Sequence, residues 1–138
     1  MKRKCILLPL LIAIGITFAG AAGDHGPGDM VKPNFSHVLP NIPGKSLVGV
    51  EVSYPPGGAS VPHHHAKSAF IYAYVVFGRI VSQVAGQPER TYGAGESFYE
   101  MPGAKHLISR NASDSEPAKL LAVFVVDTDD KVLTTPDQ

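Results

Sequence analysis

Three consecutive histidines, His63 to His65, are the clearest chemical feature of this 138-residue sequence. If they lie in a strand, alternate side chains share a face, so His63 and His65 point one way and His64 points the other. Two imidazoles separated by one residue can bind the same metal ion, and a third ligand then comes from another part of the chain. His106, which follows a Pro-Gly turn and opens an apolar run, is the candidate. The alternative interpretation is a polar, exposed turn without any ligand role.

Neutral imidazole is a ligand for several transition metals. The three histidines therefore predict a divalent metal ion, and the ligand type does not distinguish Fe, Mn, Zn, Ni and Cu. His64 is left out of the set because it faces away. His25 and His37 lie in a segment rich in Pro and Gly and are interpreted as solvated residues.

The elements that would position these residues are short strands. Six runs rich in Val, Ile, Tyr and Phe are separated by Gly, Pro, Asn or Asp. They occupy residues 45–54, 68–78, 79–86, 89–103, 105–111 and 118–127. No stretch keeps the 3.6-residue apolar period of a helix. The pattern predicts an all-β domain, either a sandwich or a small barrel.

The first 22 residues have the composition of a secretory signal peptide. A basic head precedes an apolar run over residues 5–18, and small residues follow it. Because that run is shorter than the ~20 residues of a spanning helix, we expect cleavage, export to the periplasm or the medium, and no membrane attachment afterwards. Residues 23–44 are expected to form an irregular arm, 45–127 the β domain, and 128–138 a C-terminal tail.

The charge balance of the mature chain argues against nucleic acid as a partner. Three of the 12 Lys and Arg residues lie in the predicted signal, which leaves nine against 12 Asp and Glu, a net charge of −3. No strongly basic surface is expected. The single cysteine, Cys5, also lies in the signal, so the mature protein cannot form a disulfide.

Two patterns in the β domain fit together. A glycine followed by five residues and His-x-His occurs at Gly57, His63 and His65, and Gly78 closes this pattern. A second pattern runs from Gly95-Glu96 to a Pro-x-Gly-x-x-His ending, in which Gly103 and His106 fit and Met101 replaces the usual proline. These motifs resemble those of the cupin family. The resemblance implies a jelly-roll barrel, a metal ion held by the three histidines, a small-molecule ligand, and a homodimer.

One departure from the family pattern concerns a glutamate. The family usually carries it seven residues before the closing glycine, and here that position is Ile71, in a stretch without Asp or Glu. The three-histidine set resembles that of cupin dioxygenases that cleave diketones or thiols, and it leaves more metal positions open to substrate or O₂. The alternative is a decayed site that no longer holds metal tightly.

Three further residues are candidates near this site. Glu100, six residues before His106, is interpreted either as a catalytic acid or base, as a partner that orients a histidine, or as an exposed charge. Gln83 is a candidate substrate contact, although strand parity does not settle its face. Tyr72 shares a strand face with Phe70 and Tyr74, so it either packs in the core or contacts substrate.

The sequence therefore predicts an exported, small metal-binding cupin. The leading hypothesis is a metal-dependent oxidoreductase of the dioxygenase type that acts on a small organic molecule. The alternative is a non-catalytic module of the cell envelope that binds a small ligand or the metal itself.

Overall fold

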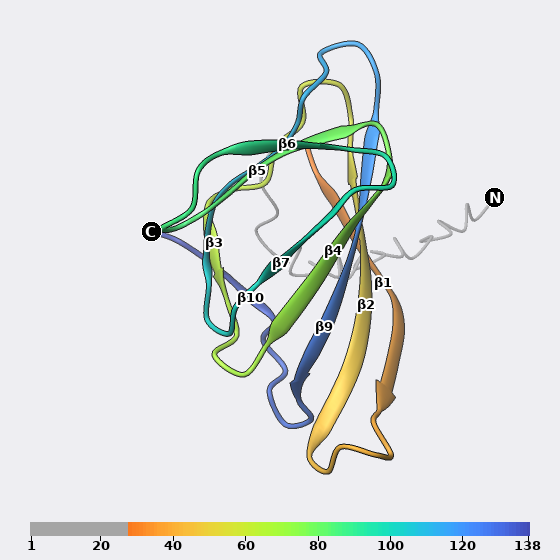
Figure 1. Ribbon diagram of the computed structural model, residues 1–138, viewed down its shortest axis with the longest axis vertical. Helices are drawn as coiled ribbons and strands as arrows, with labels where there is room; N and C mark the ends of the chain where they lie inside the picture. The colour runs from red at the N-terminus through yellow and green to blue at the C-terminus, as the bar shows by residue number, and fades with distance from the viewer. Residues whose placement is uncertain (1–27) are drawn as a thin grey trace, which may run out of the picture.

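A computed structural model describes residues 28–138, so the predicted signal peptide lies outside the described residues. Within 28–138 the chain forms ten strands joined by turns, and it contains no helix (Figure 1). No helix long and apolar enough to cross a membrane occurs in this part of the chain. The all-β class expected from the sequence is confirmed.

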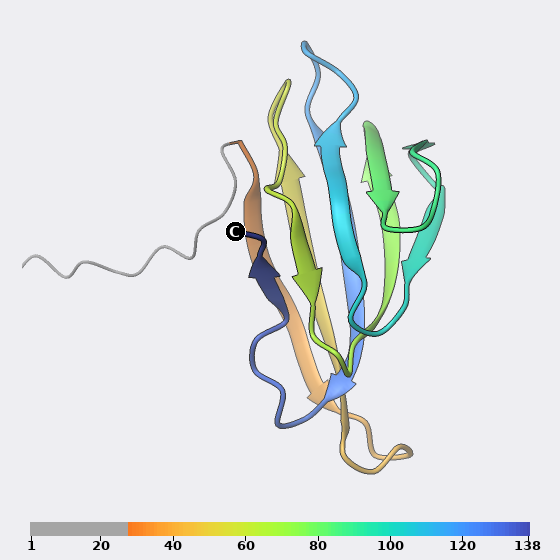
Figure 2. The same cartoon turned by 90° about the vertical axis from the view of Figure 1, so that its left-hand side faces the viewer.

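The strands form two five-stranded antiparallel sheets. The first sheet has the order β1-β2-β9-β4-β7 and the second the order β10-β3-β8-β5-β6. The first contains β1 (Met30–Val38), β2 (Lys45–Tyr54), β9 (Ala118–Asp127), β4 (Phe70–Phe77) and β7 (Ser97–Glu100). The second contains β10 (Thr134–Pro136), β3 (His63–His65), β8 (Lys105–Asn111), β5 (Arg79–Val84) and β6 (Arg90–Gly93). Figure 2 shows the two sheets facing each other, which is the arrangement of a jelly roll.

The core lies between the sheets because strand residues alternate between a buried and an exposed face. Strand β9 shows this alternation along almost its whole length, with Leu120, Ala122, Phe124 and Val126 buried. The buried residues form two clusters, one around Ile71 and Phe124 and the other around Tyr54, Val75 and Ile80. A polar site placed between these clusters is therefore enclosed by apolar side chains.

The segment 23–44 differs from the irregular arm expected from the sequence. Its residues Met30–Val38 form β1, which pairs with β2 along almost its whole length. Pro33 and Asn34 suggested a loop, but β1 is an edge strand, where a proline removes no essential hydrogen bond. The register shifts between Pro33 and Phe35, so the strand accommodates both residues at a bulge.

The glycine that closes the first motif is required by close packing. Gly78 has φ 75° at the β4–β5 turn. A Cβ atom there would lie 2.6 Å from the Cβ of Ala118 on β9. The position therefore excludes other residues both by conformation and by space, and it fixes β4 against β9.

Candidate metal centre

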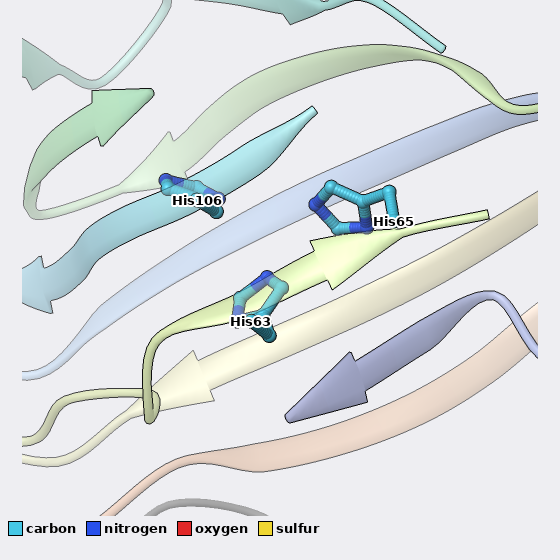
Figure 3. A group of neighbouring side chains, drawn as sticks. All are labelled: His63, His65 and His106. Carbon is cyan, nitrogen blue, oxygen red and sulfur yellow. The ribbon is translucent and has the colours of Figure 1, made fainter. Parts of the chain in front are cut away.

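The three predicted histidines meet between the two sheets. His63 and His106 are direct cross-strand partners in the β3–β8 pairing, so their side chains share a face. His65 lies two residues along β3 on the same face. One nitrogen from each ring lies within 4.8 Å of the others, and Figure 3 shows the three rings pointing toward one another. His65 and His106 are 6% and 3% exposed, and His63 is half-buried.

Hydrogen bonds hold two of these rings. The Nδ1 of His63 lies 2.8 Å from the carbonyl oxygen of Val61. Because a carbonyl only accepts, this nitrogen carries the proton and Nε2 keeps a free lone pair. His106 Nε2 lies 2.9 Å from the hydroxyl oxygen of Ser82, so its other nitrogen faces the cluster. Thr134 on β10 lies 3.4 Å from Nδ1 of His65.

The environment keeps His63 neutral. The pKa of His63 is lowered from 6.5 to about 4, mainly by burial and to a smaller extent by the neighbouring rings of His65 and His106, against the opposing effect of the Val61 carbonyl and of Glu100. A neutral imidazole is the form that binds a metal ion. The ring is therefore ready to act as a ligand at neutral pH.

Glu100 reaches the same cluster from the opposite sheet. Its side chain is 3% exposed. Oε2 lies 3.1 Å from Nε2 of His65, and Oε1 lies 3.3 Å from Nδ1 of His106. Burial acts to raise the pKa of Glu100, but the two histidines lower it to about 2. The carboxylate is therefore ionised, and the interpretation of Glu100 as an exposed charge is wrong.

The cluster lines a cavity of about 130 Å³. Most of its wall is apolar and comes from the first sheet, with Val50, Val52, Leu120, Ala122 and Phe124. An engineered apolar cavity of ~150 Å³ holds benzene. A molecule of roughly that size is thus what this cavity accommodates.

A second group of polar side chains lines the same cavity. Ser60 donates to Oδ2 of Asp29 (2.6 Å), since a carboxylate only accepts. The hydroxyl of Tyr54 then donates to Ser60 (2.9 Å), and Ser109 donates to Tyr54 (2.7 Å). These bonds form a directed chain that ends on Asp29, whose Oδ1 is buried without a hydrogen-bond partner among residues 28–138.

The residues present fit a transition metal ion. The donor set of three imidazoles suits Fe, Mn, Zn, Ni or Cu, and a buried carboxylate lies beside it. His65 Nε2 and Glu100 Oε2 are buried and have no hydrogen-bond partner in the described part of the chain, so a cation between them would satisfy both. Two nitrogens that share an ion at about 2.1 Å lie no more than ~4.2 Å apart. Binding would therefore draw the rings somewhat closer than the 4.8 Å within which their nitrogens now lie.

Two predicted substrate contacts lie elsewhere. Tyr72 is 45% exposed and is paired with Tyr99 on the outer face of the first sheet, because Ile71 and Ala73 occupy the core face of β4. Gln83 does not line the cavity, and its amide donates to the Gln87 carbonyl at 3.5 Å. Neither residue lines this cavity, and their contact with a substrate stays a prediction.

Sequence reasoning missed three groups at the site, namely Ser82, Thr134 and the chain that ends on Asp29. Ser82 had a usable signal, since it shares strand parity with the apolar Ile80 and Val84. Thr134 lay in a segment expected to be a tail, and it reaches His65 because β10 pairs with β3. Asp29 and Ser109 lie far in the sequence from Tyr54 and Ser60, so no local pattern could have joined the four residues.

Comparison with known proteins agrees with this geometry. Residues 50–124, more than half of the chain, match the family model described as a cupin domain. No functionally curated protein matches the sequence.

Several solved structures share the fold. A recombinant oxalate oxidase in complex with glycolate has a TM-score of 0.57 at 22% identity, covering 72% of this chain and 51% of the oxidase. KdgF from Halomonas sp. has a TM-score of 0.57 at 21% identity, with coverages of 78% and 88%. An uncharacterised protein with a double-stranded β-helix domain from Klebsiella pneumoniae reaches 0.62 at 14% identity, with coverages of 81% and 86%. The chain spans about half of the oxalate oxidase, and these identities show the fold alone. Its sequence match and its fold together show that the chain belongs to the cupin family.

Proposed function

We propose that this chain is a metal-dependent cupin enzyme, an oxidoreductase of the dioxygenase type that acts on a small organic molecule. The observation that carries the proposal is the convergence of three histidines and a buried carboxylate on one small apolar cavity. When bound, the ion would supply Lewis acidity and, if it is redox-active, electron transfer to O₂. A dioxygenase places both atoms of O₂ in its product, so no other oxidant is needed.

The histidines and the carboxylate have separate tasks in this proposal. His63, His65 and His106 would hold the ion, with Ser82 and the Val61 carbonyl fixing two of the rings. Glu100 has a pKa lowered to about 2, so it is a weak base at neutral pH. Its contacts with His65 and His106 support a role in orienting these rings rather than in accepting a substrate proton.

The cavity supports a narrow class of substrates. Its largely apolar wall favours a small planar or aliphatic molecule. After loss of one proton, a β-diketone (as its enolate), a phenol or a thiol would present an anionic oxygen or sulfur to the metal and an apolar body to Val50, Leu120 and Phe124. The solved structure of a recombinant oxalate oxidase in complex with glycolate gives an example of a small oxygen-bearing ligand in this fold.

Oxygen consumption tests the proposal. Mature protein loaded separately with Fe(II), Mn(II) and Cu(II) is incubated aerobically with a panel of β-diketones, phenols and thiols. The expected result is O₂ uptake with at least one member, abolished by His106→Ala. Absence of uptake with every metal and every member would contradict catalysis. A ligand recovered unchanged with the protein would then favour the binding module.

We further propose that the protein is exported and acts in the periplasm or outside the cell. The basic head, apolar run and small residues at the start of the sequence support this. Intact mass of the protein secreted from its host would show the loss of about 22 residues. A cytoplasmic product that keeps the first 22 residues would contradict export.

We also propose a homodimer formed through the outer face of the first sheet. Phe70, Tyr72 and Tyr99 are exposed there, and Phe70 stacks on Tyr99 with ring centroids 5.9 Å apart. Uncharged aromatic side chains can face their own copies across a twofold axis without like-charge repulsion. Light scattering should give twice the mature mass, and the double variant Tyr72→Lys/Tyr99→Lys should be monomeric. A monomeric parent would contradict the dimer.

A further inference from the structure

Glu100 is a buried carboxylate that no lysine or arginine of residues 28–138 neutralises. Among residues 28–138 its ion-pair partners are His65 and His106 alone, without a lysine or an arginine. Burying an ionised carboxylate is costly unless a positive charge or several hydrogen bonds compensate for it. One oxygen, Oε2, has no hydrogen bond in the described residues, although it lies 3.1 Å from His65 Nε2. Its surroundings are therefore incomplete without a cation.

Glu100 lies beside the residue that replaces the usual glutamate of the family motif. Glu100 on β7 is the direct cross-strand partner of Ile71 on β4. Direct partners point to the same face, with Cβ atoms about 4.5–5.5 Å apart. Ile71 is 1% exposed, so both side chains point into the core. Ile71 occupies the position at which the family pattern has its glutamate. Glu100 thus brings a carboxylate to the same part of the core from the neighbouring strand.

We infer that Glu100 is a fourth protein ligand of the metal, which β7 supplies in place of the missing glutamate on β4. The inference rests on the metal site of the proposed function and changes its composition from three neutral donors to three imidazoles and one anionic oxygen. The carboxylate offsets one positive charge of the ion. It also adds a hard oxygen donor, which favours Mn(II), Fe(II) and Zn(II) over Cu(I).

Two of the four inferred ligands, Glu100 and His106, lie on either side of one turn. Glu100 ends β7, and His106 is the second residue of β8, with Gly103 at φ 72° in the turn between them. His63 and His65 come together from β3. Two short segments, one in each sequence motif, therefore supply all four donors, and the metal would link the first sheet to the second.

Metal titration with two matched variants tests the inference. Mature protein without an affinity tag is titrated with Co(II) against a competing chelator, and its visible spectrum is recorded. Glu100→Gln removes the charge while preserving the shape. Glu96→Gln is the control, because Glu96 lies just before the same strand β7, is exposed, and accepts a hydrogen bond from Gly93 that a glutamine oxygen can also accept.

The expected result is a loss of Co(II) affinity of about 100-fold or more in Glu100→Gln, since even changes outside the ligand set cost 10–100-fold. The spectrum should change with it, and Glu96→Gln should match the parent. The exchange variant Ile71→Glu/Glu100→Ile returns a carboxylate to β4 and should recover most of the affinity. A Co(II) crystal structure of the parent should place a Glu100 oxygen about 2.0–2.2 Å from the ion.

The failures are distinguishable. If the parent binds Co(II) and Glu100→Gln has the same affinity and spectrum, the inference is overturned while the three-histidine site stands. A carboxylate more than ~3 Å from the ion in the crystal would overturn it in the same way. If the parent binds no Co(II) at all, the metal site of the proposed function fails instead. Thermal unfolding of the metal-free variants checks that each one is folded.

Discussion

Glu100 and Ile71 are direct partners across the β7–β4 pairing, and both side chains are buried in the core. A sequence motif read along one strand finds an aliphatic residue where the family pattern has a carboxylate. The fold places a carboxylate beside that residue from another strand. A ligand can therefore be absent from a motif and still be present in the site.

We predict that the stability of the metal-free protein falls as the pH falls below about 6.5. Burial lowers the pKa of His63 from 6.5 to about 4, so the unfolded state binds more protons between these values and unfolding becomes easier. The pKa of Glu100 is lowered from 4.5 to about 2, which acts in the same direction between those values.

Urea denaturation at pH 7.5, 5.5, 4 and 3 in the presence of a chelator measures this dependence. His63→Gln should flatten the curve between pH 6.5 and 4 and leave the lower part unchanged. A stability that rises as the pH falls from 6.5 to 4 would show that His63 is not held neutral by burial.

Ser82→Ala should weaken metal binding without removing it. The hydroxyl of Ser82 lies 2.9 Å from Nε2 of His106 and fixes the orientation of this ring. Loss of such a partner costs about 10-fold or more in metal affinity. The measurement is the Co(II) titration, with Ser97→Ala as control because Ser97 is an exposed residue of β7. Equal affinities in the parent and Ser82→Ala would mean that packing alone orients His106.

Tyr54→Phe should destabilise the fold. The Tyr54 hydroxyl bonds to Ser60 and Ser109 in the buried hydrogen-bond chain, and its removal leaves both serines short of a partner. The expected loss in the free energy of unfolding is about 1–3 kcal/mol. Tyr72→Phe, on the exposed outer face, should change it by less than about 0.5 kcal/mol. Both variants remove a tyrosine hydroxyl. Equal urea midpoints would therefore show that the hydrogen bonds of the Tyr54 hydroxyl contribute nothing to the stability of the fold.

Gly78→Ala should cost more stability than Gly86→Ala. Both glycines have positive φ, 75° and 82°, so each substitution carries a strain of about 1–2 kcal/mol. At Gly78 the new Cβ would also meet Ala118 at 2.6 Å, whereas at Gly86 no atom lies within 4 Å. Overpacking adds about 1–3 kcal/mol. Thermal unfolding of the two variants measures the difference, and equal losses would mean that β9 moves away without cost.

Local patterns predicted much of the site. The period of two placed His63 and His65 on one face, and the turn before β8 placed His106 at a strand start. The outward direction of Tyr72 was not predicted, because several aromatic residues on one strand face suggested a core, but β4 turns Ile71 and Ala73 into the core and leaves the larger rings outside. Strand β1 was missed because Pro33 is compatible with an edge strand, which only the pairing reveals.

The contact of Glu100 with the histidines could not be predicted from either motif alone. It depends on the register between β4 and β7, and on the two sheets facing each other across the cavity. The face of Gln83 likewise depends on which side of β5 turns toward the histidines. Ser82, one residue earlier, contacts His106, so Gln83 lies on the opposite face of the strand.

The most direct test of the central claim is the metal content of the mature, untagged protein, measured by elemental analysis beside His63→Ala, His65→Ala and His106→Ala. The account predicts close to one equivalent of a transition metal in the parent and a loss in each variant, because the three rings converge on one position. A parent that holds little metal even after reconstitution, or variants that keep a full equivalent, would contradict it.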